Sequence, residues 1–200
     1  VNCKLEDFLP GPNVKYNKNK KEYYFDKESN NSIGKVHTFF GNFGILVRAY
    51  VYILSLGNKG LRDISLHAVL NSNYLKFLLM DKYDVPFSEG TLHEFVISAL
   101  KQKNRGVRAL DIAKTLLDYG FHSPTVYFPI NIPESIMIEP TETESKNTIE
   151  KFAKAMLDID ERIDEEKEYI LNAPYNTPVR RLNETKANRE LNINYYETKE

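Results

Sequence analysis

The spacing of apolar residues predicts four helices in this chain. Residues 43–56 are apolar almost throughout, with Arg48 as the only charge, so we expect a buried helix there. Asn42 precedes it and is a good N-cap residue. Arg48 is expected either to be paired structurally or to serve a site or an interface. Apolar residues at helical spacing predict two further helices, over residues 60–82 and 107–119.

The fourth predicted helix is the longest and covers residues 142–171. Thr141 is followed three positions later by Glu144, which is the spacing of a capping box and places the helix start beside this pair. An apolar stripe runs along the helix, and its second half is rich in Asp and Glu. We interpret this acidic face as solvated, with docking of another subunit as the alternative.

Three short stretches rich in β-forming residues predict strands, over residues 91–100, 126–128 and 136–138. Residues 101–106 are expected to form a polar loop. Gly120 stands where a helix ends and a residue with positive φ is wanted. Three strands, mainly antiparallel, with helices covering one face make a small α+β domain.

The N-terminal part of the chain is polar and only weakly periodic. Residues 15–21 form a basic excursion between two aromatic-rich flanks, which predicts a solvated hairpin. A basic run with aromatic neighbours can also bind nucleic acid. This run is short and is followed by Asp26 and Glu28, so we prefer the hairpin interpretation. Beyond Ala173 the chain becomes polar again, and we expect a C-terminal tail there.

The composition is that of an ordinary globular chain, with 42% hydrophobic and 28% charged residues. A net charge of −1 provides no basic field for nucleic acid. Cys3 is the single cysteine, which excludes an internal disulfide and a cysteine metal site. No apolar run approaches the ~20 residues that cross a bilayer, and no secretory signal opens the chain. We therefore expect a cytoplasmic protein that binds neither nucleic acid nor a membrane.

Polar residues that could carry chemistry gather at predicted strand ends and loops, where a rigid frame can hold them. The candidates are His122, Ser123, Thr125, His93, Glu94, Glu139 and Thr141. The four histidines lack the spacing of metal ligands, so no metal site is expected. Neither a Gly-rich phosphate loop nor a Gly-x-Ser-x-Gly elbow is present. Asn42 could help to present backbone N–H groups to an anion, such as a cofactor, or act only as a helix cap.

Several short motifs follow one another in a distinctive order. The two longest are Tyr-Gly-Phe-His-Ser-Pro-Thr at residues 119–125 and Ile-Glu-Pro-Thr-Glu-Thr-Glu at residues 138–144. The other segments are 5–10, 41–44, 68–74 (Ala-Val-Leu-Asn-Ser-Asn-Tyr), 93–95 and 109–114. Together they resemble the C-terminal part of glycine decarboxylase, the pyridoxal-phosphate P-protein of the glycine cleavage system. The resemblance is to the second subunit of the split form and covers roughly residues 4–190.

The resemblance implies the C-terminal small domain of a fold-type-I pyridoxal-phosphate enzyme. It implies decarboxylation of glycine, transfer of the aminomethyl group to the lipoyl arm of H-protein, and a heterotetramer with subunit 1. In this family the Schiff-base lysine follows a histidine and precedes a Gly-rich stretch. No lysine of this chain follows a histidine. We therefore expect that lysine before Val1, and we expect this chain alone neither to bind pyridoxal phosphate nor to be active.

On the same basis we expect residues 1–42 to connect to a large domain, residues 43–172 to form the small domain with its linking helix, and residues 173–200 to be a tail. The candidate residues would form walls of the cofactor cleft, help to hold the glycine carboxylate and admit the lipoyl arm. A structural role is the alternative for each. A non-catalytic α+β interaction module, and the small domain of another aminotransferase-like enzyme, also stay open.

Overall fold

The structure, a computed structural model, describes residues 3–26 and 29–194. The chain divides into two compact units, Val1–Gly57 and Asn58–Glu200. The boundary falls within helix α1 (Phe43–Leu79), where Gly57 has φ 61° and ψ −177°. Glycine reaches this backbone conformation easily and other residues essentially do not. Helix α1 therefore consists of two helical segments, one before and one after Gly57.

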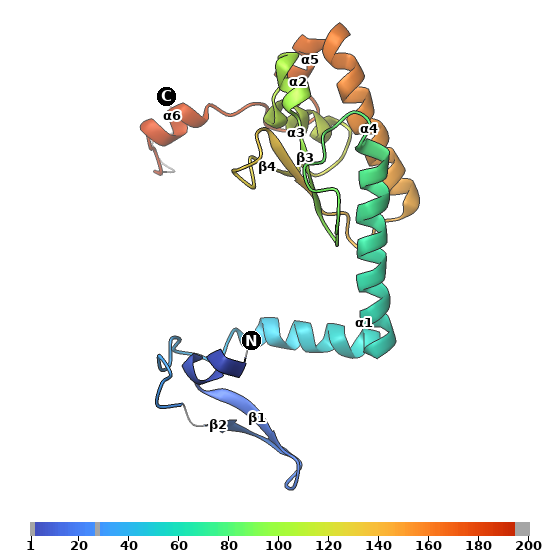
Figure 1. The fold of residues 1–200 in the computed structure, drawn as a ribbon. Helices are drawn as coiled ribbons and strands as arrows, with labels where there is room; N and C mark the ends of the chain where they lie inside the picture. Colours follow the sequence, from blue (N-terminus) through green and yellow to red (C-terminus); the bar gives the residue numbers. More distant parts are fainter. Residues whose placement is uncertain (1–2, 27–28, 195–200) are drawn as a thin grey trace. The chain divides into compact units, whose positions relative to one another are not determined.

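The first unit contains a β-hairpin. Its described elements are the 3-10 helix η1 (Cys3–Phe8), β1 (Asn13–Asn17), β2 (Glu22–Asp26) and the first segment of α1 (Figure 1). The hairpin is antiparallel, with Asn13 opposite Asp26. Lys15 forms an ion pair with Asp26 at 2.6 Å, and the rings of Tyr16 and Tyr23 lie 4.9 Å apart. The predicted solvated hairpin is therefore confirmed.

The first segment of α1 forms where the sequence predicts it, but the prediction that it is buried is wrong. Asn42 caps the helix, because its Oδ1 accepts the N–H of Ile45 at 3.2 Å. The apolar side chains are open to solvent, with Phe43 80% and Leu54 62% exposed. Among the described residues of this unit, the hairpin and the 3-10 helix expose their own large side chains and provide no apolar layer. Arg48 is exposed and has no ion-pair partner among the residues that the structure describes.

The second unit is built on a three-stranded sheet. Its elements after α1 are β3 (Phe95–Ser98), α2 (Leu100–Asn104), α3 (Ala109–Asp118), β4 (Thr125–Val126), β5 (Ser135–Ile138), α4 (Lys146–Glu165), α5 (Lys167–Asn172) and α6 (Glu184–Arg189). The strand order is β3-β5-β4. Both pairings are antiparallel, with Phe95 opposite Ile138 and Val126 opposite Ile136. The α+β prediction is confirmed.

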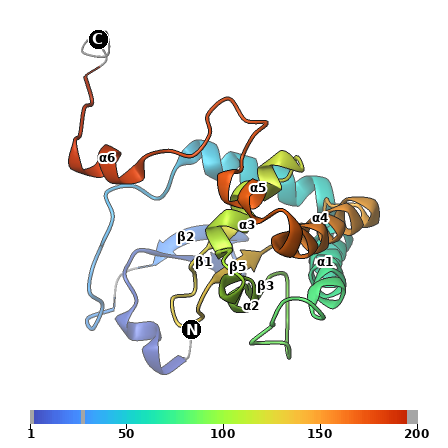
Figure 2. The same cartoon turned by 90° about the horizontal axis from the view of Figure 1, so that it is seen from above.

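One core joins the sheet to the helices of this unit. Helix α3 contacts β4, α4 and α5, and α4 runs beside the second segment of α1 (Figures 1 and 2). The phenol of Tyr83 is fully buried and donates to the carbonyl of Met156 at 2.9 Å, which ties the end of α1 to α4. The largest fully buried side chains include Leu75, Leu79, Tyr83, Ile97, Ile112, Leu116, Ile136, Met156, Ile159 and Ile170.

A short helix, α2, occupies the segment that was expected to be a polar loop. Gln102 is 1% exposed, and its Nε2 donates to Asp160 Oδ1 at 2.7 Å. Arg105 pairs with both Asp160 and Asp164 at 2.7 Å. These polar contacts hold the helix against α4. Because the side chains that hold α2 in place are polar, this segment lacks apolar residues at helical spacing. Hydrophobic spacing alone could therefore not predict α2.

Two predicted strands are shorter in the structure than the sequence suggests. Strand β3 begins at Phe95, so His93 and Glu94 lie in the loop before it. Strand β4 ends at Val126 because Tyr127 has φ 61°, which takes the chain out of the extended region. The polar candidates around these strands therefore lie at strand ends and in loops.

The predicted capping box is wrong. Helix α4 begins after Ser145, whose hydroxyl accepts the N–H of Thr148 at 3.1 Å. Thr141 and Glu144 form a turn instead, because the Thr141 carbonyl accepts the Glu144 N–H at 3.2 Å. The single long helix that was expected is two helices, α4 and α5, separated by the non-helical residue Glu166.

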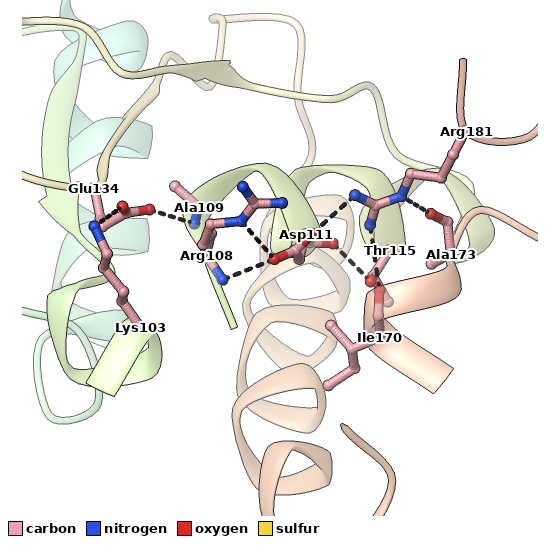
Figure 3. A network of polar contacts seen from close by, with 9 residues as sticks. All are labelled: Lys103, Arg108, Ala109, Asp111, Thr115, Glu134, Ile170, Ala173 and Arg181. Atoms are coloured by element: carbon pink, nitrogen blue, oxygen red, sulfur yellow. Dashed lines mark hydrogen bonds and ion pairs between the residues drawn. The ribbon is translucent and has the colours of Figure 1, made fainter. Parts of the chain in front are cut away.

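Two buried carboxylates surround the start of α3, as Figure 3 shows. Glu134 accepts the N–H of Ala109 at 2.8 Å and pairs with Lys103 at 2.7 Å. Asp111 accepts the N–H of Arg108 at 2.9 Å. The free N–H groups at a helix start favour negative charge, so both carboxylates stabilise this end of α3.

The chain beyond α5 is tied back to α3 by the same network (Figure 3). Arg181 donates to Asp111 Oδ1 at 2.8 Å and to the carbonyl of Ala173 at 2.5 Å. At the other end of α3, the carboxylate of Asp118 accepts the N–H of Tyr175 at 2.7 Å. Residues 173–181 therefore pack against α3 through two carboxylates, even though this segment is polar.

Candidate functional site

A cavity of about 350 Å³ opens beside the end of α3, the β4–β5 strands and the first turn of α4. Its size lies within the range of small-molecule sites. It is lined by Leu75, Phe121, His122, Ser123, Pro124, Thr125, Met137, Ile138, Glu139, Pro140, Glu144, Thr148, Ile149 and Phe152. Four of the predicted site residues, His122, Ser123, Thr125 and Glu139, are brought together here. We call it the α3–α4 cavity.

A second cavity of about 370 Å³ lies against the second segment of α1. Its lining is Ile64, Ser65, Ala68, Val69, Leu92, His93, Glu139, Pro140, Thr141 and Glu142. We call it the α1 cavity. It gathers the candidates His93 and Thr141, and Glu139 with Pro140 lines both cavities. Glu94 lines neither cavity, but its carboxylate lies 4.0 Å from the His93 ring.

The loop that carries His122 is fixed at both of its ends. Gly120 has φ 80° and ends α3, as the sequence predicts. Phe121 packs edge-on against Phe152 of α4, with ring centroids 5.2 Å apart. Thr125 then pairs with Met137 in the sheet. The loop is therefore short and anchored, while the His122 ring itself is exposed at the cavity mouth.

The charges in the α3–α4 cavity come from carboxylates and one imidazole. Glu139 and Glu144 contribute two carboxylates, and no lysine or arginine lines either cavity. Donors for an anion are limited to the His122 ring and to the hydroxyls of Ser123, Thr125 and Thr148. The remaining lining is mainly apolar. This set suits a small polar group or a neutral, partly apolar ligand.

The same donor set does not fit pyridoxal phosphate. A phosphate group is bound by cations and backbone N–H groups, and the cofactor aldehyde is bound by a lysine. The α3–α4 and α1 cavities together contain three carboxylates, those of Glu139, Glu142 and Glu144, and no basic side chain other than histidine. These two cavities are therefore not a complete cofactor site.

Asn42 belongs to the first unit and is not among the residues that line the two cavities. Its side-chain oxygen is used as the cap of α1. A hollow of about 490 Å³ lies beside it, lined by residues 37–42. The cap role is therefore established by geometry, and a role in binding a cofactor stays a prediction.

Sequence reasoning missed three residues of this region. Glu144 and Thr148 line the α3–α4 cavity; the prediction assigns Glu144 to a helix cap and places Thr148 within the helix 142–171. Asn71 touches neither cavity, but its amide binds the loop between β5 and α4. An asparagine within an otherwise apolar helical pattern was the available signal for it.

Residues 3–26 and 29–194 contain neither a cluster of metal-ligating side chains nor a membrane-spanning helix. No group of three or more His, Cys, Asp or Glu side chains there is arranged to hold a metal ion. Within the same ranges, no helix combines the length and the apolar character needed to cross a bilayer.

The arrangement of strands and helices matches that of a known enzyme domain. A crystal structure of glycine decarboxylase, the P-protein of the glycine cleavage system, in inhibitor-bound form, is similar with a TM-score of 0.54. The match has 16% sequence identity and covers 78% of this chain and 37% of that protein. The fold is thus that of part of a P-protein, an α+β domain with ligand-sized cavities at the ends of its strands.

Other proteins share a much higher sequence identity with this chain than this solved structure does. Residues 64–180 match the family described as glycine dehydrogenase, C-terminal domain, and the chain belongs to this family. Proteins named probable glycine dehydrogenase (decarboxylating) subunit 2 are 49% identical in Chloroherpeton thalassium and 50% identical in Staphylococcus saprophyticus. The matches cover 98% and 95% of this chain. The chain spans about two fifths of the length of these relatives, 40% and 38% respectively.

Proposed function

We propose that this chain is the C-terminal part of subunit 2 of a pyridoxal-phosphate-dependent glycine decarboxylase. The observation that carries the proposal is the match of proteins of that name over nearly all of this chain, with about half of the residues identical. The whole protein decarboxylates glycine and passes the remaining aminomethyl group to the lipoyl arm of H-protein. It works in the cytoplasm as a heterotetramer with subunit 1. Residues 1–42 connect to a large domain, and residues 173–200 form the tail.

In this proposal the α3–α4 cavity faces the substrate. His122, Ser123 and Thr125 are the donors that can bind the glycine carboxylate, because they come from an anchored loop and lie together in one lining. The apolar side chains behind them give the cavity a partly apolar wall, beside which hydrogen bonds are stronger than in bulk water. Glu139 lies on the wall shared with the α1 cavity.

The α1 cavity has a different role in the proposal. It carries His93 and Thr141 beside an apolar surface from α1, with Glu94 next to His93. We assign it to the path by which the neutral, partly apolar lipoyl arm approaches the substrate. The Schiff-base lysine and the phosphate site belong to the remainder of the protein, because neither cavity supplies them.

The test uses His122 in the assembled enzyme with subunit 1 and lipoylated H-protein. His122→Asn is expected to lower the rate of carbon dioxide release from carboxyl-labelled glycine at least tenfold, about 1.4 kcal/mol of transition-state stabilisation. The melting temperature should change little, because the ring is exposed. His122 also lies near the C-terminal end of α3, where a cation is favoured by the helix dipole. Normal activity together with a lower melting temperature would assign His122 to that end of the helix instead.

A matched control is His67→Asn. His67 is exposed on α1 and lines neither of the two cavities. Its substitution should leave glycine decarboxylation within twofold of the wild-type rate. An equal loss in both variants would show that the assay responds to general disturbance of the domain, and the assignment of His122 would fail.

A further inference from the structure

The wall between the two cavities is a short connection, residues 139–145, between β5 and α4. Glu139 lines both cavities, Thr141 lines the α1 cavity and Glu144 lines the α3–α4 cavity. The connection contains no regular element. Its internal bonds include the turn from the Glu144 N–H to the Thr141 carbonyl at 3.2 Å and the contact between the hydroxyls of Thr141 and Thr143 at 2.7 Å. Contacts from α1 also hold this connection in place.

Asn71, on the second segment of α1, supplies such a contact. Its Nδ2 donates to the carbonyl of Thr141 at 2.9 Å and to the carbonyl of Glu144 at 3.2 Å. Both partners are backbone carbonyls, which only accept hydrogen bonds, so the amide nitrogen must face them. One side-chain amide thus joins the two ends of the turn to a helix about seventy positions earlier in the chain.

The same helix holds the second loop of the site. Asn73 Nδ2 donates to the carbonyl of Thr91 at 3.1 Å. Lys76 Nζ donates to the carbonyl of Ser88 at 2.7 Å and to Thr91 Oγ1 at 2.8 Å. This loop leads directly into His93 and Glu94. The loop carrying His93 and the wall carrying Glu139 are therefore both held by side chains of α1.

We infer that Asn71 is a positioning residue, which fixes the 139–144 wall and thereby the geometry of both cavities. The effect on catalysis rests on the proposed function. The two hydrogen bonds from Asn71 to the Thr141 and Glu144 carbonyls, which we call the Asn71 clamp, are a property of this chain. The clamp needs an amide donor and no particular loop side chain, because the acceptors are carbonyl oxygens. Asn71→Asp keeps the shape and replaces the donor by a carboxylate oxygen that faces the two carbonyls, so it should release the wall. Asn71→Ala removes the donor without adding charge, and it serves as the second variant if the Asp variant does not fold.

The first measurement is backbone hydrogen exchange of the full chain, wild type and variant. Exchange of the Glu144 N–H, which donates to the Thr141 carbonyl in the turn held by Asn71, should increase at least tenfold in Asn71→Asp or Asn71→Ala, while the core strands β3 and β5 keep their protection. Asn172→Asp is the matched control, because the Asn172 amide donates to the Glu168 carbonyl of its own helix. That control should leave exchange of the Glu144 N–H unchanged. Unchanged exchange at Glu144 in the Asn71 variants would overturn the inference.

The second measurement is steady-state kinetics of the assembled enzyme. The Asn71 variants should lower kcat/KM for glycine at least tenfold, and Asn71→Gln, which keeps an amide on a longer arm, should recover part of the loss. Faster exchange with unchanged kcat/KM in an enzyme whose wild type is active would overturn the positioning role. A wild-type enzyme that does not decarboxylate glycine would instead overturn the proposed function, and the exchange experiment would still decide whether the clamp exists.

Discussion

Both segments of α1 are predicted as helices from their apolar residues, but they differ in burial in the structure. Residues 43–56 are the more apolar segment, and their large side chains are exposed. Residues 58–79 contain more polar residues, but Leu75 and Leu79 are in the core at 2% and 0% exposure. In the second segment Asn71, Asn73 and Lys76 use their polar groups to bind loops of the same unit.

This difference shows that the formation of a helix and the burial of a helix are separate properties. Spacing identifies a helix, because an apolar stripe needs a helical period. It does not identify the surface that covers the stripe. The second segment has its covering elements within the unit, namely α4 and the sheet, whereas the described residues of the first unit, 3–26 and 29–57, form a hairpin and a 3-10 helix besides the helix itself. Burial therefore follows from the neighbouring elements and not from the helix alone.

The largest expected effect tests this contrast directly. Leu79→Ala should lower the free energy of unfolding of the second unit by about 3 kcal/mol, because it removes a fully buried side chain and leaves a cavity. Leu54→Ala, at a position 62% exposed, should change stability by less than about 0.5 kcal/mol. Urea unfolding followed by far-UV circular dichroism measures both. Equal losses would show that the first segment is covered within this chain and would remove the contrast.

A smaller effect concerns the residue that separates the segments. An alanine at position 57 would be strained by about 1–3 kcal/mol in the present conformation, although there is room for a methyl group. Gly57→Ala should therefore move this residue into the helical region and make the helix continuous. Backbone carbon chemical shifts of residues 56–58 report the change. In the control, Gly44→Ala, the backbone has no positive φ, so the shifts around position 57 should stay as they are. Retention of the break in Gly57→Ala with no loss of stability would contradict the assignment.

The smallest expected effects are pH-dependent and occur at opposite ends of the pH range in the two units. The Arg105 guanidinium bonded to Asp164 lowers the pKa of that carboxyl below its usual 3.8. Its stabilising effect on the second unit is thus complete above that value, and is lost as the pH falls through the lowered pKa. In the first unit, the carboxylate of Asp26 raises the pKa of Lys15 above 10.5. That contribution is present below pH 10.5 and is lost as the pH rises through the raised pKa.

Two substitutions measure these contributions. Asp164→Asn should reduce the acid dependence of unfolding of the second unit below about pH 4 and leave the alkaline limb unchanged. Lys15→Met should reduce the alkaline dependence of the hairpin, followed by its NMR signals. Both groups are largely exposed, so the changes should be small and should decrease with added salt. An Asp164→Asn variant with the same acid limb as the wild type would show that this ion pair does not stabilise the second unit.

Much of the fold could be predicted from local rules. Gly120 ends α3, Asn42 caps α1, and the β-forming residues around Ile136 form the central strand, because each of these depends on neighbouring residues only. The start of α4 could not be predicted in this way. Thr141 and Ser145 are both good cap residues; in the structure Ser145 caps the helix, while the Thr141 carbonyl is bound by Asn71 from another helix.

The candidate site shows the same limit. Placing polar residues at strand ends was enough to select His122, Ser123, Thr125 and Glu139, which the structure brings into one lining. The division into two cavities with a common wall could not be predicted, because it depends on how the 139–145 connection packs against α1. The resemblance to the P-protein added the family, which the comparisons confirm.

The ion pair between Arg181 and Asp111 has a practical consequence for anyone who expresses this domain alone. The family match ends at residue 180, one position before Arg181. A recombinant boundary drawn there would delete the guanidinium that lies 2.8 Å from Asp111, a carboxylate with 1% exposure, and would leave it the longer pair with Arg108 at 3.4 Å. Loss of one partner from a buried charge pair is more damaging than loss of an exposed one. The physical edge of the domain therefore lies beyond its edge in sequence comparison, and a truncated gene should extend past Arg181 to give a well-behaved product.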